Sequence, residues 1–251
     1  MVEQPPAKRL SLRQGAALLA LALAGALAGW LVGHRSSSPV VASGDKVAIE
    51  QVVRDYILQH PEILPEAMER LREREDAKNL SAVADQVKAP FPGAVLGNPS
   101  GKVTLVEFTD FACTYCRQSV ADVEALIAAN PELKVVIREL PILSPQSTDA
   151  ARMALAAAEQ GLYPAFHRAM YAIGRPDAQT IAAAARQAGL DMARANRFIA
   201  DPKVEAEIAR NLELARQLGF NGTPAWVAGE ALLSGAVGQA QLARALEKVE
   251  G

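Results

Sequence analysis

The chain has 251 residues, of which 50% are hydrophobic and only 5% aromatic, and its formal net charge is −2. This length suits one good-sized domain with extensions, and the abundance of alanine and leucine favours a helix-rich protein. A near-neutral chain without a cluster of basic residues among aromatic ones is a poor candidate for binding nucleic acid.

The N-terminus carries a segment that predicts export. Residues 15–33 contain no charged side chain and follow three basic residues in the n-region, residues 1–14. An apolar run of this length can span a bilayer as a helix, and the preceding positive charge places the N-terminus in the cytoplasm. The alternative is a cleaved signal peptide, because residues 26–28 and 40–42 offer small side chains to a signal peptidase. We favour an uncleaved anchor, and both interpretations export residues 45–251.

After a polar linker at residues 34–45, residues 46–88 predict two helices that are separated at Pro61. We expect the second helix to run from about Glu62 into the region of Ala82. The first helix repeats apolar side chains at helical spacing, namely Ile49, Val52, Val53, Tyr56 and Ile57. Two short amphipathic helices bury little surface alone. We therefore predict self-association through residues 46–88, with packing onto the same chain as the alternative.

A stretch rich in proline and glycine near residues 88–100 marks the start of the main domain, residues 90–250. The runs "KVTLVEFTDF" and "LKVVIREL" predict two buried strands, and the helical pattern from Thr114 to Ala129 lies between them. A helical insertion of at least four helices follows at about residues 147–218. Two short strands around Gly229 and a final helix complete the order β-α-β, helices, β-β-α, which is an α/β fold.

The two cysteines of the chain, Cys113 and Cys116, lie at the turn from the first strand into its helix. Unpaired N–H groups and the helix dipole at this end favour an anion, so we expect the pKa of the Cys113 thiol to fall below its usual value of about 8.5. Cys116 lies one turn further on and should be shielded. Cys113 can then form a mixed disulfide with a substrate, which Cys116 resolves.

Other uses of a CxxC pair fit less well. Structural zinc requires about four ligands, and neither a second CxxC nor paired histidines are present, so we expect no metal site. A structural disulfide would close too small a loop to restrict the unfolded chain much. A Cu(I) site in a copper-stress protein stays open as the alternative function, and so does a non-catalytic assembly protein, which would tolerate loss of both cysteines.

The stretches "VLGNPSGKVTLVEFTDFACTYC", "ELPILSPQS" and "GTPAWVAGEALLSGAV" resemble the exported thiol–disulfide oxidoreductases similar to DsbA. The resemblance implies a thioredoxin fold with an inserted helical domain, with Cys113 as the nucleophile and Cys116 as the resolving cysteine. It also implies a cis peptide bond at Thr223-Pro224, whose loop faces the disulfide and binds the substrate.

Glu107 matches the buried acid of that family and could take the proton of Cys116. The alternative is an ordinary ion pair between Glu107 and Arg138 on the neighbouring strand. Asp110 is nearer to the cysteines in sequence, and we expect its side chain to be exposed.

Thr114 and Tyr115, which we expect to contact the substrate, differ from the Pro-His pair of the best-known oxidase of this family. This difference, together with threonine before the cis proline, favours an isomerase or a reductase. The segment "AIEQVVRDYILQHPEILPEAMERL" resembles the N-terminal segment of the ScsC (suppressor of copper sensitivity) branch, in which such helices associate into oligomers.

The resemblance implies a protein of the bacterial periplasm, held at the inner membrane if residues 15–33 are retained. Its substrates would be exported proteins with thiols or disulfides, and a membrane redox partner would reset the cysteine pair. No cofactor is expected beyond this redox-active disulfide.

Overall fold

The computed structural model describes residues 43–250, with side chains for residues 46–247. The predicted anchor or signal at residues 15–33 lies outside this range. Within it, no helix combines the length and the apolar character needed to cross a membrane. The chain divides into two compact units, residues 1–65 and residues 66–251.

The described part of the first unit consists mainly of α2 (Ser43–Gln59), which ends just before Pro61. The large apolar side chains of α2 are strongly exposed, among them Val47, Ile49, Val52, Val53, Tyr56 and Leu58. The next helix, α3 (Ile63–Lys88), begins at the end of this unit and extends beyond the predicted region of Ala82. Its last turns bury Leu80, Val83 and Val87.

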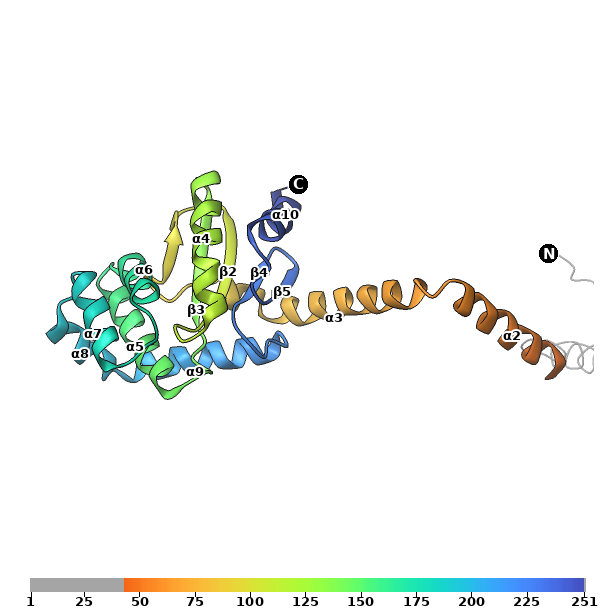
Figure 1. The fold of residues 1–251 in the computed structure, drawn as a ribbon, viewed down its shortest axis with the longest axis horizontal. Helices are drawn as coiled ribbons and strands as arrows, with labels where there is room; N and C mark the ends of the chain where they lie inside the picture. The colour runs from red at the N-terminus through yellow and green to blue at the C-terminus, as the bar shows by residue number, and fades with distance from the viewer. Residues whose placement is uncertain (1–42, 251) are drawn as a thin grey trace, which may run out of the picture. The chain divides into compact units, whose positions relative to one another are not determined.

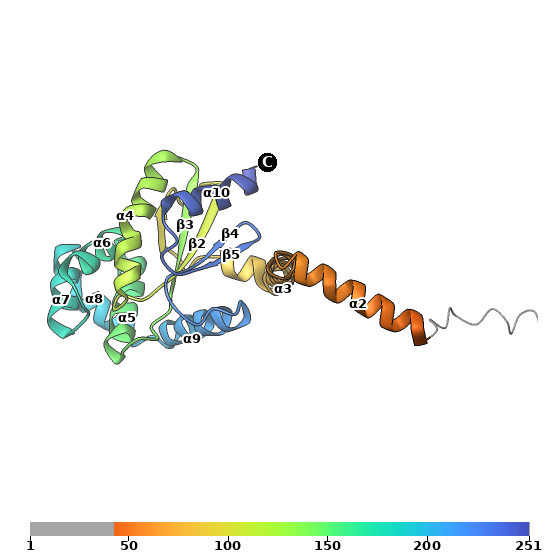
Figure 2. The same ribbon diagram turned by 45° about the vertical axis from the view of Figure 1, so that its right-hand side comes forward.

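The centre of the second unit is a five-stranded sheet in the order β1-β3-β2-β4-β5 (Figures 1 and 2). Its strands are β1 (Val95–Gly97), β2 (Val103–Thr109), β3 (Leu133–Glu139), β4 (Ala225–Ala228) and β5 (Ala231–Ser234). Strands β2 and β3 are parallel, and the other pairs are antiparallel. The central strands β2 and β3 are buried over nearly their whole length, as strands covered on both faces should be.

Two hydrophobic clusters cover the two faces of the sheet. On one face, α4 (Thr114–Ala129) and α10 (Gln239–Glu250) pack with the helices that follow β3. On the other face, the end of α3 packs with α9 (Pro202–Gln217). Because successive residues of a strand point to opposite faces, β2 sends Glu107 and Thr109 into the first layer and Phe108 into the second.

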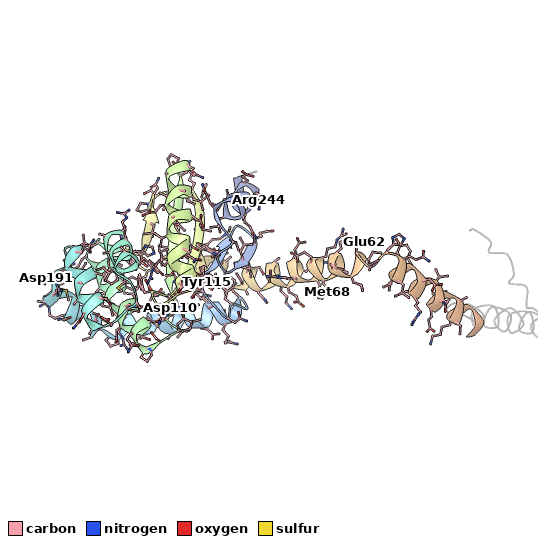
Figure 3. The ribbon with its side chains drawn as sticks, viewed as in Figure 1. Glu62, Met68, Asp110, Tyr115, Asp191 and Arg244 are labelled. Carbon is pink, nitrogen blue, oxygen red and sulfur yellow. The ribbon has the colours of Figure 1, made fainter. Side chains whose placement is uncertain are left out.

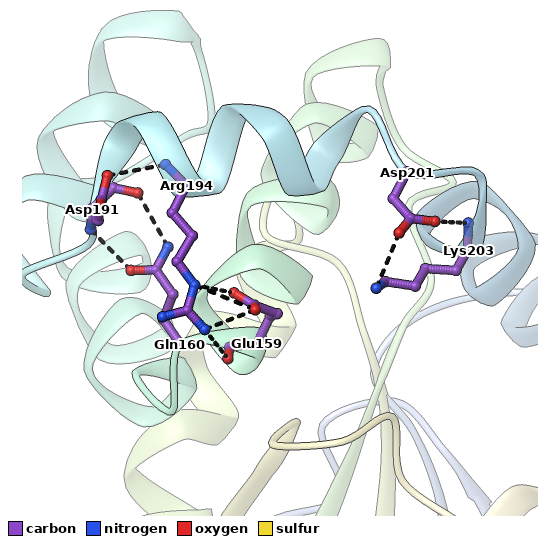
Figure 4. Close-up of polar contacts among 6 residues, drawn as sticks. All are labelled: Glu159, Gln160, Asp191, Arg194, Asp201 and Lys203. Carbon is purple, nitrogen blue, oxygen red and sulfur yellow. Dashed lines mark hydrogen bonds and ion pairs between the residues drawn. The ribbon is translucent and has the colours of Figure 1, made fainter.

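Five helices lie between β3 and β4, from Pro145 to Gln217. They are α5 (Pro145–Glu159), α6 (Tyr163–Ile173), α7 (Ala178–Gln187), α8 (Met192–Ile199) and α9. Polar contacts at their ends hold them together (Figure 4). Arg194 on α8 donates to the carboxylate of Glu159 at the end of α5, at 2.7 and 2.9 Å. Asp191 caps α8, and Asp201 caps α9.

Candidate active site

Cys113 is the N-cap of α4, and the thiols of Cys113 and Cys116 are both free. Sγ of Cys113 accepts a hydrogen bond from the backbone N–H of Cys116 at 3.4 Å. The pKa of Cys113 falls to about 5, chiefly because of a hydrogen bond from the Cys116 side chain, with smaller contributions from Thr223 and backbone N–H groups, while burial opposes the shift. The pKa of Cys113 is thus lowered as expected, and the hydrogen bond from the Cys116 thiol lowers it more than the backbone N–H groups of Tyr115 and Cys116 do.

Cys116 has the opposite character, because its side chain is fully buried. Burial is the main cause that raises its pKa, and the hydrogen bond to Cys113 and the negative charge of Glu107 raise it further. At neutral pH the pair thus holds one thiolate at Cys113 and one thiol at Cys116. Cys113 is thus the nucleophile, and the buried Cys116, whose thiol keeps its proton, lies one helical turn further along α4.

Glu107 is 3% exposed and lies in the layer beneath α4. Its neighbours across the sheet are Ile137 and Trp226. Burial raises the pKa of Glu107 to about 8, a hydrogen bond with Thr109 opposes this, and the charge of Cys113 adds to it. A carboxyl group with this pKa exchanges its proton near neutral pH, as a general base must.

The alternative pairing of Glu107 with Arg138 is wrong. Arg138 is the register partner of Phe108, so it points to the other face of the sheet. There its guanidinium binds Glu207 at 2.9 Å and Asn211 at 3.1 Å. Glu107 forms no ion pair within the described part of the chain.

The Thr223-Pro224 peptide bond is cis, as the resemblance implied. Sγ of Cys113 lies 3.2 Å from the backbone oxygen of Thr223, to which its thiol form donates a hydrogen bond, although the two residues are 110 positions apart. The hydroxyl oxygen of Thr223 is buried and forms no regular hydrogen bond with any of the described residues, and its effect on Cys113 lowers the pKa of that thiol. Thr114 is exposed, and Tyr115 is 62% exposed beside the cysteines (Figure 3).

Asp110 is 1% exposed, so the expectation that it is exposed is wrong. One of its carboxylate oxygens accepts from the N–H of Ala112 at 2.8 Å, and the other accepts from Ile142 and Leu143 at 2.9 and 3.0 Å. Three backbone donors replace water around this carboxylate. Asp110 thereby ties the loop before Cys113 to the loop after β3.

Three polar residues of this site carried no recognisable signal in the sequence. Glu139 on β3 is 1% exposed and accepts a hydrogen bond from Tyr163 at 2.6 Å. Burial raises the pKa of Glu139 well above its usual value. Tyr171 on α6 contacts Thr109 with its hydroxyl group at 2.7 Å. The tyrosines come from the inserted helices, and only the tertiary fold brings them to Glu139 and Thr109.

Among residues 46–247, no group of three histidine, cysteine or acidic side chains could hold a metal ion. The cysteine pair alone offers two sulfur ligands, fewer than structural zinc uses.

Comparison with known proteins agrees with this geometry. Residues 104–247 match the DSBA-like thioredoxin domain, and residues 45–78 match the N-terminal domain of the copper resistance protein ScsC. A thioredoxin-like oxidoreductase from Silicibacter pomeroyi is 45% identical, with 62% of this chain and 91% of that chain covered and a TM-score of 0.60.

Two further solved structures are similar. A linker-deletion mutant of ScsC from Proteus mirabilis is 26% identical, with 84% of this chain and 98% of that chain covered and a TM-score of 0.66. A periplasmic thioredoxin-like protein from Salmonella enterica serovar Typhimurium is 28% identical, with 66% and 95% covered and a TM-score of 0.60.

The chain spans about a fifth of the length of the curated relatives that it matches. An Na⁺/H⁺ antiporter, NhaA 3 of Salinispora tropica, is 33% identical over 135 residues, which are 52% of this chain and 20% of the antiporter.

A thioredoxin-like fold with a CxxC pair at a helix N-terminus defines the class of thiol–disulfide oxidoreductases. The chain belongs to the family of DSBA-like thioredoxin domains, which its match covers over more than half of the sequence. The predicted thioredoxin-like α/β fold is confirmed.

Proposed function

We propose that this protein exchanges disulfides with exported proteins in the bacterial periplasm through Cys113 and Cys116. The observation that carries the proposal is the position of Cys113, which caps α4 one turn before the buried Cys116 and lies against the backbone of Thr223 at the cis Thr223-Pro224 bond. The opposite pKa shifts of the two thiols agree with it. The pair itself is the redox group, so the reaction needs no further cofactor. The similarity to a periplasmic thioredoxin-like protein supports the compartment.

The exchange has two steps. The thiolate of Cys113 attacks a disulfide, so that a mixed disulfide forms at Cys113 and one substrate sulfur leaves as a thiolate. Cys116 then gives its proton to the Glu107 carboxylate and attacks Cys113. The Cys113–Cys116 bond forms, the bond from Cys113 to the substrate breaks, and the substrate leaves reduced. The reverse sequence oxidises a dithiol.

Substrate recognition involves the loop of Thr223 and Pro224 and the residues between the cysteines. The backbone of Thr223 already contacts Sγ of Cys113, so an extended substrate strand can pair with it beside the nucleophile. The exposed side chains of Thr114 and Tyr115 face the solvent from which the substrate arrives.

We propose that the pair works as an isomerase or a reductase. A stabilised thiolate favours the reduced form of the pair, and the pKa of about 5 for Cys113 lies between the values of about 3.5 for DsbA and about 7 for thioredoxin. An intermediate reduction potential allows the protein to break wrong disulfides as well as to form new ones. A membrane redox partner would reset the pair.

Trapping of mixed disulfides tests the exchange. Cys116→Ser should accumulate disulfide-linked adducts with periplasmic proteins, because nothing resolves them. The matched control, Cys113→Ser, should give none. A wild-type protein that holds stoichiometric Cu(I), together with a Cys116→Ser variant that forms no adduct, would favour the copper-binding alternative.

The exposed apolar side chains of α2 support self-association through residues 46–88. Ile49, Val52, Val53 and Tyr56 recur at intervals of three and four residues and stay exposed, which is the pattern of a helix that packs on a partner helix. The match of residues 45–78 to the ScsC N-terminal domain adds to this. Light scattering should show an oligomer that Val53→Glu dissociates and the control Gln51→Glu does not. A monomeric wild-type protein would contradict this assignment.

A further inference from the structure

Two buried hydroxyl groups meet in the layer of the sheet that also holds the cysteine pair. Oγ1 of Thr109 and the phenolic oxygen of Tyr171 lie 2.7 Å apart, although 62 positions separate the two residues. Thr109 has no exposed surface, and Tyr171 is 3% exposed. The phenol also donates to the backbone oxygen of Asp110 at 3.2 Å. Thr109 lies at the end of β2, whereas Tyr171 comes from α6 of the inserted helices (Figure 1).

The Thr109 hydroxyl lies on the same face of the sheet as Glu107, the group that accepts the proton in the resolving step. Thr109 follows Glu107 by two positions on β2, so both side chains point to the same face of the sheet. A hydrogen bond with Thr109 lowers the pKa of Glu107 and also that of Cys116. The Thr109 hydroxyl therefore affects both Cys116, which gives up the proton, and Glu107, which accepts it.

The number of hydrogens fixes how the two hydroxyls are arranged. A carbonyl oxygen only accepts, whereas a hydroxyl group donates once and also accepts. While Cys116 and Glu107 are protonated, Tyr171 donates to the Asp110 carbonyl and Thr109 donates to Tyr171, which leaves the oxygen of Thr109 free to accept. When Cys116 or Glu107 ionises, both hydroxyls can rotate, so that Tyr171 donates to Thr109 and Thr109 donates to the anion.

We infer that Thr109 and Tyr171 form a reversible hydroxyl pair that stabilises the anion on Cys116 or Glu107 during the resolving step. Tyr171 is then a positioning residue that the inserted helices contribute to the thioredoxin site. The inference rests on the proposed function, because the hydroxyl pair acts in the second step of the proposed disulfide exchange. In that step the proton moves from Sγ of Cys116 to the Glu107 carboxylate, the Cys113–Cys116 bond forms, and the substrate sulfur leaves as a thiolate.

Other titratable groups face the same layer. Burial lowers the pKa of His167 to about 3, so its ring is neutral near neutral pH, and burial raises the pKa values of Glu139 and Tyr163 well above their usual range. The groups are Glu107 from β2, Glu139 from β3, Cys113 and Cys116 from α4, Tyr163, His167 and Tyr171 from α6, and Asp110 from the loop before α4. The pH profile of the resolving step therefore reports the coupled pair of Cys116 and Glu107.

Stopped-flow reaction of the reduced full-length protein with Ellman's reagent separates the two steps. Attack by Cys113 releases a first thionitrobenzoate, and resolution by Cys116 releases a second. Thr109→Val should slow the second release about tenfold at neutral pH, the usual worth of a hydrogen bond to a charged group, and should move its pH profile upward. The first release should not change.

Two variants control this measurement. Thr109→Ser keeps the hydroxyl and should restore the second release, whereas Thr104→Val makes the same substitution at the start of β2 and should behave like the wild type. If Thr109→Val does not fold, Thr109→Ala against Thr109→Ser makes the same comparison. A second release that is equally fast and has the same pH profile with and without the hydroxyl overturns the inference.

A double-mutant cycle tests the part of Tyr171. The upward shift that Thr109→Val causes should shrink to less than half in a Tyr171→Phe background, because the two hydroxyls act together. An undiminished shift would mean that Tyr171 only packs there, and would overturn its assignment. A wild-type protein that releases only one thionitrobenzoate would instead refute the resolving step, and with it the proposed function.

Discussion

Near the ends of β2 and β3, the two faces of the sheet differ in whether a buried ionisable side chain has a partner of opposite charge. On one face, Arg138 is 1% exposed and is compensated by the Glu207 carboxylate, by Asn211 and by backbone oxygens at the end of α3, including that of Val87. On the other face, Glu107 and Glu139 are equally buried, and neither forms an ion pair within the described residues.

This difference distinguishes Arg138, which stabilises the fold, from Glu107, which can exchange a proton with the cysteine pair. A buried ion that is paired and hydrogen-bonded keeps its charge and holds elements together. A buried acid without a cation keeps its proton until a neighbour takes it or the pH rises. The first arrangement joins α3 and α9 to the sheet, whereas the second gives the cysteine pair a group that exchanges protons. We therefore expect Glu107 to destabilise the fold, whereas Arg138 stabilises it.

Glu107→Gln should give the largest effect. The folded-state pKa of about 8 exceeds the usual 4.5, so the wild type loses free energy of unfolding as the pH rises from about 4.5 to 8, by about 4–5 kcal/mol in total. The variant lacks this loss, so its stability should exceed that of the wild type increasingly over this range. Urea unfolding at several pH values measures this. If the free energies of unfolding of the wild type and the variant changed in parallel with pH, the raised pKa of Glu107 would be refuted.

Glu107→Gln should also slow the resolving step about 100-fold.

Arg138→Ala should destabilise the domain by about 3–5 kcal/mol, because it leaves Glu207 buried without its partner. Arg216→Ala is the matched control. It breaks an exposed pair with Glu213, which should cost less than about 1 kcal/mol. Urea unfolding of both variants at neutral pH makes the comparison. Equal losses would mean that the buried pair has no special role.

Tyr163→Phe should give the smallest effect, about 1–2 kcal/mol, because it removes the single hydrogen bond to Glu139. The pKa of Glu139 should rise further, since that bond lowers it. Infrared spectra of the protonated carboxyl band, compared with those of Glu139→Gln, can assign the change. A band that does not move in Tyr163→Phe would contradict the contact.

The sequence predicts the reactive atoms of this site better than their surroundings. The cysteines, the helix that begins at Thr114 and the cis bond before Pro224 follow from a local motif and a family resemblance. The burial of Asp110 depends on N–H groups of Ile142 and Leu143, more than 30 positions away. Tyr171 reaches Thr109 only because α6 packs on the sheet, and no spacing in the sequence records that contact.

The failed pairing of Glu107 with Arg138 has a simpler reason. Both residues lie on adjacent strands, but the register aligns Glu107 with Ile137, so Glu107 and Arg138 point to opposite faces. A shift of one position would have brought them together. Sequence alone predicts the two strands without their register, so it cannot separate a structural ion pair from a proton acceptor.

Titration of the reduced wild-type protein, followed by the ultraviolet absorbance of thiolate, tests the central claim most directly. We expect one thiol to ionise near pH 5 and the second to stay protonated well above the usual cysteine pKa. Cys113→Ser should remove the low-pH transition, and Cys116→Ala should keep a single transition, at higher pH because the hydrogen bond from the Cys116 side chain is lost. Two thiols that titrate together at the usual cysteine value of about 8.5 would contradict the account.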